Sequence, residues 1–344
     1  MDRTLFFILV LFYQFCFSQS SKTLSKIDSL KTDIEAVNFI RSCSQSKDDF
    51  LSEFRLKTIR SFEDDNLSPL IKRTADSLGV DKSFYKGDFD HNGKTDLLFI
   101  GDDNSCQSSR GSCSAVVKVI FDIDNKYMTK SLLLNHFDFV IPKLSTINGK
   151  DYISVFYDEV SEDFNSEKYN FYHKIVNKIL TYKFDNFVEY NPEPQKYSIE
   201  KIFFETEPCF GTCPVFTLEL SKNGTSQFIA KTYNFINRND SFEKIERKSR
   251  KTFEKGEGKF TTQIKASDFQ KIETILGYIN FPELKDDYSV SWTDDQLSTL
   301  TITYDNGKIK KIKDYGLVGS YGLTTLYKTL FDLRFNQEWK KIKH

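Results

Sequence analysis

Oxygen-bearing side chains recur at close spacing in residues 88–96. They stand at the first, third, fifth and ninth positions of this segment: Asp88, Asp90, Asn92 and Asp96. Gly93 stands at the sixth position, where such a loop must bend sharply, and Lys94 follows at the seventh, where a backbone carbonyl can serve as a ligand. Calcium prefers six to eight hard oxygen ligands around one point. The spacing therefore predicts a structural calcium site made of these four side chains and the Lys94 carbonyl, with a metal-free acidic hairpin as the alternative.

The loop resembles the D-x-D-x-D/N-G-x-x-D hairpin loops of FG-GAP repeats. In that family the loop joins two strands and binds calcium, so the resemblance implies the same arrangement here. The EF-hand loop fits less well, because Phe99 stands where that loop needs a bidentate acid, and residues 97–100 look like a strand. A propeller needs several copies of the loop, whereas this sequence carries one.

A second group of acids could support hydrolysis of a glycosidic bond or sugar binding. Paired carboxylates perform such hydrolysis, and aromatic side chains bind sugars beside them. The candidates lie in one predicted loop: Asp286, Asp287, Tyr288, Trp292, Asp294 and Asp295. The alternative is a solvated loop that precedes a strand.

The cysteines predict two local disulfides, Cys106–Cys113 and Cys209–Cys213, with Cys43 left unpaired. Reduced thiols are the alternative for each pair. A dithiol oxidoreductase is disfavoured, because three residues separate Cys209 from Cys213 and Pro214 leads into a strand rather than a helix. A zinc site is also disfavoured, because the four histidines show no paired spacing.

Residues 1–18 are typical of a cleavable signal peptide. Arg3 supplies positive charge, an apolar run covers residues 5–17, and small residues Cys16 and Ser18 precede a cut before Gln19. The apolar run is too short to span a bilayer. An uncleaved anchor and a lipoprotein cut before Cys16 are the alternatives. We expect a periplasmic, cell-surface or secreted protein without a transmembrane span after cleavage.

The overall composition is that of a globular protein with balanced charge. Its 344 residues suffice for about two domains, and 48 basic against 49 acidic residues give a net charge of −1. No global field therefore draws the chain to nucleic acid, and we expect no nucleic-acid partner.

The first half predicts helices followed by strands. Apolar residues recur at helical spacing from Leu24: Leu24, Ile27, Leu30, Ile34, Val37 and Ile40. A second helix is predicted over residues 50–59, and a third from Ser68 as N-cap to Gly79 as the stop signal. Strands are then predicted at 99–101, 116–121, 152–156 and 179–184, with a hairpin turn at Asn148-Gly149.

The second half follows a proline-containing stretch and predicts a new set of strands. Hairpin turns are expected at Asn223-Gly224 and Asn306-Gly307, a capping box at residues 267–270 opens one helix, and leucines from 323 to 333 mark another. The order predicts an α+β fold of two domains. Residues 19–190 would hold helices and an antiparallel meander, residues 191–195 a linker, and residues 196–344 a second antiparallel sheet with two helices.

The string C-F-G-T-C-P-V-F at residues 209–216 resembles an uncharacterised family of exported proteins from Gram-negative bacteria. Its members carry C-F-G-x-C-P-V/I-Y/F followed by a D/N-G hairpin, which Asn223-Gly224 matches. The resemblance continues through Phe281, Leu284, the Thr293-Asp294 stretch and Asp314-Tyr315-Gly316. It implies a domain of unknown function over residues 196–344 and no particular activity.

These features favour a non-catalytic binding or structural module of the cell envelope, stabilised by calcium, whose partner is an envelope protein or a glycan. The alternative is a secreted hydrolase that uses the carboxylates of residues 286–295.

Overall fold

The computed structural model describes residues 25–44, 50–63, 67–102, 115–124, 126–134, 139–163, 170–234, 256–290 and 292–342, without the side chains of residues 50 and 160–172. The predicted signal peptide and the predicted Cys106–Cys113 pair lie outside these ranges. The chain divides into two compact units, Met1–Thr181 and Tyr182–His344. The predicted linker at 191–195 stays a prediction. Within the second unit, Asn191 donates hydrogen bonds from its backbone and side-chain amides to Tyr278.

The first unit begins with short helices that the sequence predicted only in part. The expected helix from Leu24 is divided into a 3-10 turn, η1 (Lys26–Ser29), and α2 (Asp33–Ser42). Ser25 and Thr32 each form a capping box, and the second box starts a new helix. The new helix turns Ile34 outward with 74% exposure, so its predicted inward position is wrong.

The predicted helix over residues 50–59 is also wrong. Two 3-10 turns, η2 (Phe50–Glu53) and η3 (Ile59–Ser61), flank a short strand, β1 (Arg55–Leu56), which pairs with β3. Helix α3 (Pro69–Leu78) is confirmed, because Ser68 caps the amide of Ile71 and Gly79 ends the helix with a φ of 69°. That positive φ explains the glycine at this position.

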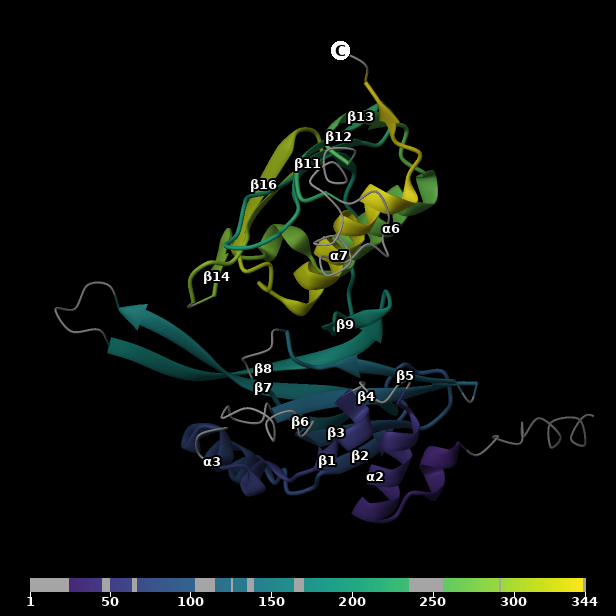
Figure 1. The fold of residues 1–344 in the computed structure, drawn as a ribbon, viewed down its shortest axis with the longest axis vertical. Coiled ribbons are helices and arrows are strands. Elements are labelled where there is room, and N and C mark those ends of the chain that lie inside the picture. The colour runs from purple at the N-terminus through teal and green to yellow at the C-terminus, as the bar shows by residue number, and fades with distance from the viewer. Residues whose placement is uncertain are drawn as a thin grey trace, which may run out of the picture. The chain divides into compact units, whose positions relative to one another are not determined.

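The first unit contains a five-stranded sheet in the order β1-β3-β4-β5, with β2 also paired to β3 (Figure 1). Its further strands are β2 (Phe84–Gly87), β3 (Asp96–Asp102), β4 (Ala115–Ile123) and β5 (Lys126–Ser131). Every residue of β3 is buried. Gly87 pairs with Asp96, so residues 88–95 connect two antiparallel strands as a hairpin loop.

A four-stranded sheet has the order β6-β7-β8-β9. Its strands are β6 (Ile141–Ile147), β7 (Lys150–Asp163), β8 (Asn170–Lys183) and β9 (Asn186–Glu189). The predicted turn at Asn148-Gly149 is confirmed, because Ile147 pairs with Lys150 and both turn residues have positive φ, 52° and 73°.

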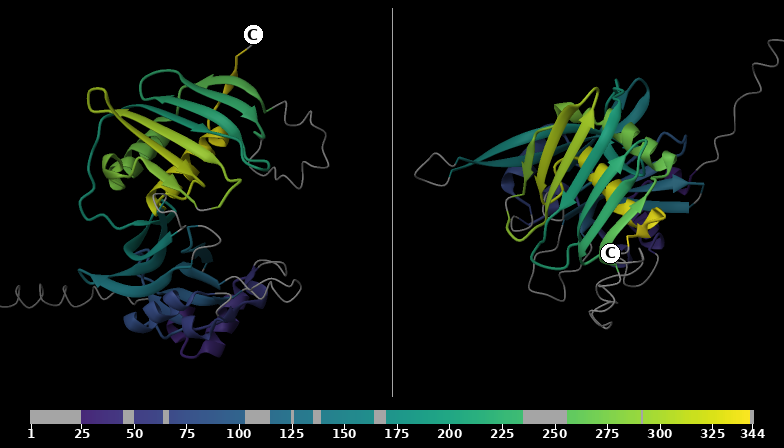
Figure 2. Two further views of the ribbon diagram at one scale, coloured as in Figure 1. Left: turned by 90° about the vertical axis from the view of Figure 1, so that its left-hand side faces the viewer. Right: turned by 90° about the horizontal axis from the view of Figure 1, so that it is seen from above.

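The second unit contains an eight-stranded sheet in the order β14-β16-β15-β10-β11-β12-β13-β17. All its neighbouring strands are antiparallel except β14 and β16, and two helices lie against one face (Figures 1 and 2). The strands are β10 (Ile199–Thr206), β11 (Val215–Ser221), β12 (Ser226–Thr232), β13 (Gly258–Thr262), β14 (Asp287–Ser289), β15 (Leu297–Tyr304), β16 (Lys308–Tyr315) and β17 (Lys340–Lys341).

The helices of the second unit are α6 (Ala266–Tyr278), the turn η5 (Phe281–Glu283) and α7 (Tyr321–Asn336). The predicted capping box at 267–270 is wrong, because the helix begins earlier and the Lys265 carbonyl accepts from the amides of Asp268 and Phe269. The predicted final helix is confirmed as α7, and its leucines are all buried in the core of the second unit: Leu323, Leu326, Leu330 and Leu333. The predicted α+β class is confirmed.

Candidate functional site

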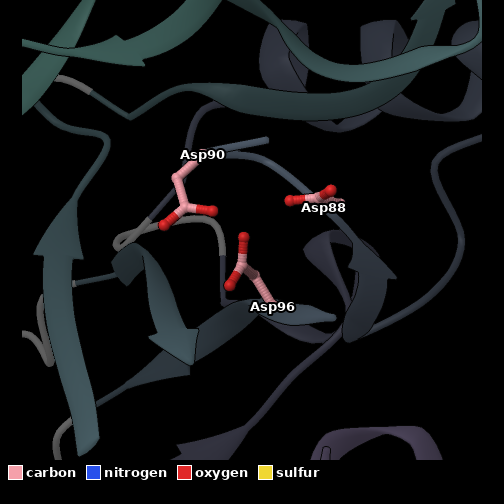
Figure 3. A group of neighbouring side chains, drawn as sticks. All are labelled: Asp88, Asp90 and Asp96. Atoms are coloured by element: carbon pink, nitrogen blue, oxygen red, sulfur yellow. The ribbon is translucent and has the colours of Figure 1, made fainter. Parts of the chain in front are cut away.

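Three carboxylates meet where β2 turns into β3. Asp88 follows β2, Asp90 lies in the connecting loop, and Asp96 is the first residue of β3. One oxygen from each lies within 4.8 Å of the others, and Figure 3 shows the three groups facing a common point. Among the described residues this is the one group of at least three acidic, histidine or cysteine side chains close enough to share a metal ion.

The loop is wound by bonds between its own backbone and side chains. The Gly93 amide donates to Asp88 Oδ2 at 2.9 Å, and the Asn92 amide donates to Asp90 Oδ1 at 3.1 Å. Two loop residues have left-handed φ values, 61° at His91 and 85° at Gly93. Glycine suits the second position because it adopts positive φ without strain. These bonds turn the loop acids inward.

Asp96 is the buried member of the group, with no exposed surface. Its oxygens accept the amide hydrogens of Phe89 at 2.8 Å and Asp122 at 3.0 Å. The pKa of Asp96 is raised to about 8, mainly by burial and also by the charges of Asp90 and Asp88, although the Asp122 and Phe89 amides act in the opposite direction. The pKa of Asp90 is also raised, first by burial and then by Asp88. Burial and the neighbouring carboxylates therefore disfavour the ionised forms of Asp90 and Asp96, and a bound cation would stabilise those forms.

Asp88 leaves one oxygen without a partner. Its Oδ2 accepts from Gly93, whereas its Oδ1 is buried and has no hydrogen bond. A buried carboxylate oxygen normally has a donor or a metal ion beside it. This oxygen and the two neighbouring carboxylates fit a hard divalent cation such as calcium.

Asn92, another predicted ligand, has different partners in this structure. Asn92 Oδ1 accepts from the Lys94 amide at 2.8 Å, and Asn92 Nδ2 donates to Asp90 Oδ2 and to the Asp122 carbonyl, both at 2.9 Å. The Lys94 ammonium pairs with Asp124 at 2.8 Å, whereas the predicted ligand at this position is the Lys94 backbone carbonyl. The structure thus gathers Asp88, Asp90 and Asp96, while the oxygen of Asn92 is engaged by Lys94.

Residues from outside the loop support it, and sequence reasoning missed them. Asp151 of β7 accepts from the Asp88 amide at 3.1 Å, and its carbonyl lies 2.8 Å from His91 Nε2. Asp28 of η1 accepts from the Thr95 hydroxyl at 2.6 Å. No local pattern announces these contacts, because they depend on which strand and turn lie beside the loop.

The acids of the second unit have mostly structural partners. Asp286 forms an ion pair with Lys310 of β16 at 2.6 Å. Asp295 accepts from Trp292 Nε1 at 3.0 Å and from the Gln296 amide at 2.7 Å, and the Tyr288 hydroxyl accepts from the Lys285 amide at 3.1 Å. Asp287 and Asp294 are exposed. The structure therefore keeps the six candidates in one region without gathering their carboxylates around one point.

The Cys209–Cys213 pair is a disulfide, with Cα atoms 5.8 Å apart, and Cys43 is free among the described cysteines, as predicted. Burial raises the pKa of the Cys43 thiol to about 11, so this thiol is unreactive at neutral pH. The disulfide closes a loop that lies between β10 and β11.

Asp314 is a buried carboxyl that we did not single out for chemistry. It is fully buried in β16 and accepts from the Val318 and Gly319 amides at 3.3 and 2.9 Å. Burial raises its pKa, although these amides act in the opposite direction. The same amides tie the turn after β16 to the strand, which positions the start of α7.

No helix among the described residues combines the length and the apolar composition that crossing a bilayer requires. No match was found among curated proteins or among solved structures. Residues 200–334 match the model of a family described as a domain of unknown function (DUF6438). This range runs from β10 into α7, so the second half of the chain is similar to an uncharacterised domain family, as the sequence resemblance implied.

Proposed function

We propose that the protein is an exported, non-catalytic binding module of the cell envelope whose first unit is stabilised by a calcium ion. The predicted signal peptide supports export, and the loop at residues 88–96 supports the ion. The alternative of a hydrolase receives less support, because Asp286 and Asp295 already have structural partners.

The observation that carries the proposal is the buried, unpartnered Oδ1 of Asp88 beside two further carboxylates. A water molecule could donate to one unpartnered oxygen. Three carboxylate groups with oxygens within 4.8 Å of one another repel, however, and a cation relieves that repulsion. A calcium ion would bind Asp88 Oδ1 and would also offset the repulsion among the three carboxylates. Each oxygen that accepts an amide hydrogen still has a second lone pair for the metal.

The ion would act as a structural link between β2 and β3. A ligand that binds only the folded state stabilises it by RT ln(1 + [L]/Kd), about 2.7 kcal/mol when calcium exceeds its dissociation constant a hundredfold. The loop connects β2 and β3, which contribute to the core of the first unit. Bound calcium would therefore raise the free energy of unfolding of the whole unit.

The test is the melting temperature of residues 19–344 in excess calcium and in chelator. We expect calcium to raise it by several degrees and Asp88→Asn to abolish the rise, since the amide keeps the side-chain shape but loses the charge. Asp81→Asn, an exposed acid outside the loop, is the matched control and should respond as the parent does. Equal melting temperatures with and without calcium would refute the site.

A further inference from the structure

Phe210 projects into solvent from the disulfide loop of the second unit. Its side chain is 88% exposed, more than any other large apolar side chain that the structure describes as exposed. Isolated exposed apolar residues are common, and Ile34 and Ile309 are exposed as well. Exposure alone therefore does not mark Phe210 as a binding residue, but the bonds that hold its loop distinguish it.

Three kinds of bond fix the loop. The Cys209–Cys213 disulfide closes it, and the Phe210 amide donates to the Asp294 carbonyl at 3.1 Å. Gln296 joins both ends, because its Nε2 donates to the Glu207 carbonyl at 2.8 Å and to the Pro214 carbonyl at 2.9 Å. Gln296 is only 5% exposed, so this clamp lies beneath the surface.

A rigid loop that holds an aromatic ring outward has the properties of a binding anchor. Protein interfaces are enriched in aromatic residues, phenylalanine included, and ordering the anchor before binding lowers the entropy lost on association. Ile34 and Ile309 lie on a helix and a strand without such a clamp. The loop around Phe210 thus differs from the positions of Ile34 and Ile309 in the bonds that hold it.

The charged residues of the two loops that contain Phe210 and Asp294 are all acidic. Glu207 and Asp294 are exposed, Asp295 is half-buried, and residues 207–214 and 292–296 contain no lysine or arginine. Such a rim attracts a basic surface and disfavours an anionic lipid headgroup. A sugar would need several free polar groups around the ring, whereas the Asp295 carboxylate and the Trp292 indole nitrogen bind each other.

We propose that Phe210 is the anchor through which the second unit binds a protein partner that presents an apolar pocket rimmed by lysine or arginine. The inference deepens the proposed binding function and rests on it, but it does not depend on calcium. It assigns recognition to the two loops that contain Phe210 and Asp294.

The experiment selects random peptides displayed on phage against oxidised residues 19–344, followed by titration of a selected synthetic peptide by fluorescence anisotropy. We expect peptides that combine apolar and basic residues. Phe210→Ala should weaken binding by about tenfold or more, without changing the melting temperature. Ile309→Ala removes another largely exposed apolar side chain, 68% exposed, and should bind as the parent does.

Charge variants test the rim. Glu207→Gln and Asp294→Asn should each weaken peptide binding severalfold and reduce its dependence on salt, because each removes one negative charge from the rim. Asp294→Asn keeps the backbone carbonyl that holds Phe210, so the position of the ring should not change. A selection without enriched peptides, or peptides that bind Phe210→Ala as tightly as the parent, would overturn the proposal. Phe210-dependent binding to a glycan array, to anionic vesicles or to a second copy of the chain would overturn the assignment of the partner. A missing calcium response would refute only the metal site.

Discussion

The backbone amide of Phe210 donates to the backbone carbonyl of Asp294 across 3.1 Å. This bond joins the cysteine loop to the acidic loop, which the sequence presents as separate candidates. Gln296 strengthens the connection from below, with bonds to the carbonyls on both sides of the cysteine loop. The two loops therefore form one surface at one end of the β10, β11 and β15 strands.

Gln296→Ala should destabilise the second unit by about 1–3 kcal/mol, because two carbonyls lose a buried donor at once. The measurement is chemical denaturation of residues 19–344. Gln270→Ala, on the exposed face of α6, is the control and should change stability by less than about 0.5 kcal/mol. Equal effects of the two substitutions would show that Gln296 does not clamp the loop.

The disulfide should contribute less than its position suggests. Closing so short a loop stabilises by about 2 kcal/mol in the chain-entropy model. Since Gln296 and Asp294 already hold the loop, we expect the Cys209→Ser/Cys213→Ser variant to remain folded at 25 °C. A parent protein that unfolds when its disulfide is reduced would contradict this expectation.

Local signals in the sequence predicted those elements that local bonds determine. Helix α3 follows from Ser68, Pro69 and Gly79, and the strand pairs on either side of Asn148-Gly149 follow from the turn. The predictions that were wrong concern residues whose structure depends on contacts with distant parts of the chain. Leu51, Phe54 and Ile59 have helical spacing, but their burial is achieved by two 3-10 turns and a strand that pairs with β3.

In the candidate sites too, contacts within one segment were predictable from the sequence, whereas contacts between distant segments were not. The spacing within one loop predicted Asp88, Asp90 and Asp96, which the structure brings together. Asp151 was not predictable, because its bond to Asp88 depends on the placement of β7 beside the loop. The disulfide followed from spacing, whereas the Phe210–Asp294 bond depends on the order of β11, β10 and β15 in the sheet.

Asp314 should make the stability of the second unit depend on pH. Its pKa is raised by burial, so the folded state binds the proton more tightly than the unfolded chain does. The resulting stability is fully present below the unfolded pKa of about 3.9 and is lost as the pH rises through the folded pKa. We therefore expect the parent to lose stability relative to Asp314→Asn as the pH rises through this window.

Denaturant unfolding of both proteins at several pH values measures this difference. The amide of Asp314→Asn faces the Val318 and Gly319 amides at every pH, so its steric and hydrogen-bonding penalty is constant and the change with pH isolates the carboxyl. A stability difference that is the same at all pH values would show that the Asp314 pKa is not raised.

Asp151→Ala should weaken calcium binding, although Asp151 is not in the loop. Its carboxylate accepts the Asp88 amide hydrogen at 3.1 Å and thereby holds the backbone of the proposed ligand. A hydrogen bond of about 0.5–1.5 kcal/mol corresponds to a loss of roughly threefold to tenfold in affinity, measured by isothermal titration calorimetry. Asp151→Asn keeps an acceptor and removes the charge, so it should retain most of the affinity. Equal losses in the two variants would show that Asp151 acts through its charge, and an unchanged affinity in Asp151→Ala would show that β7 does not position the loop.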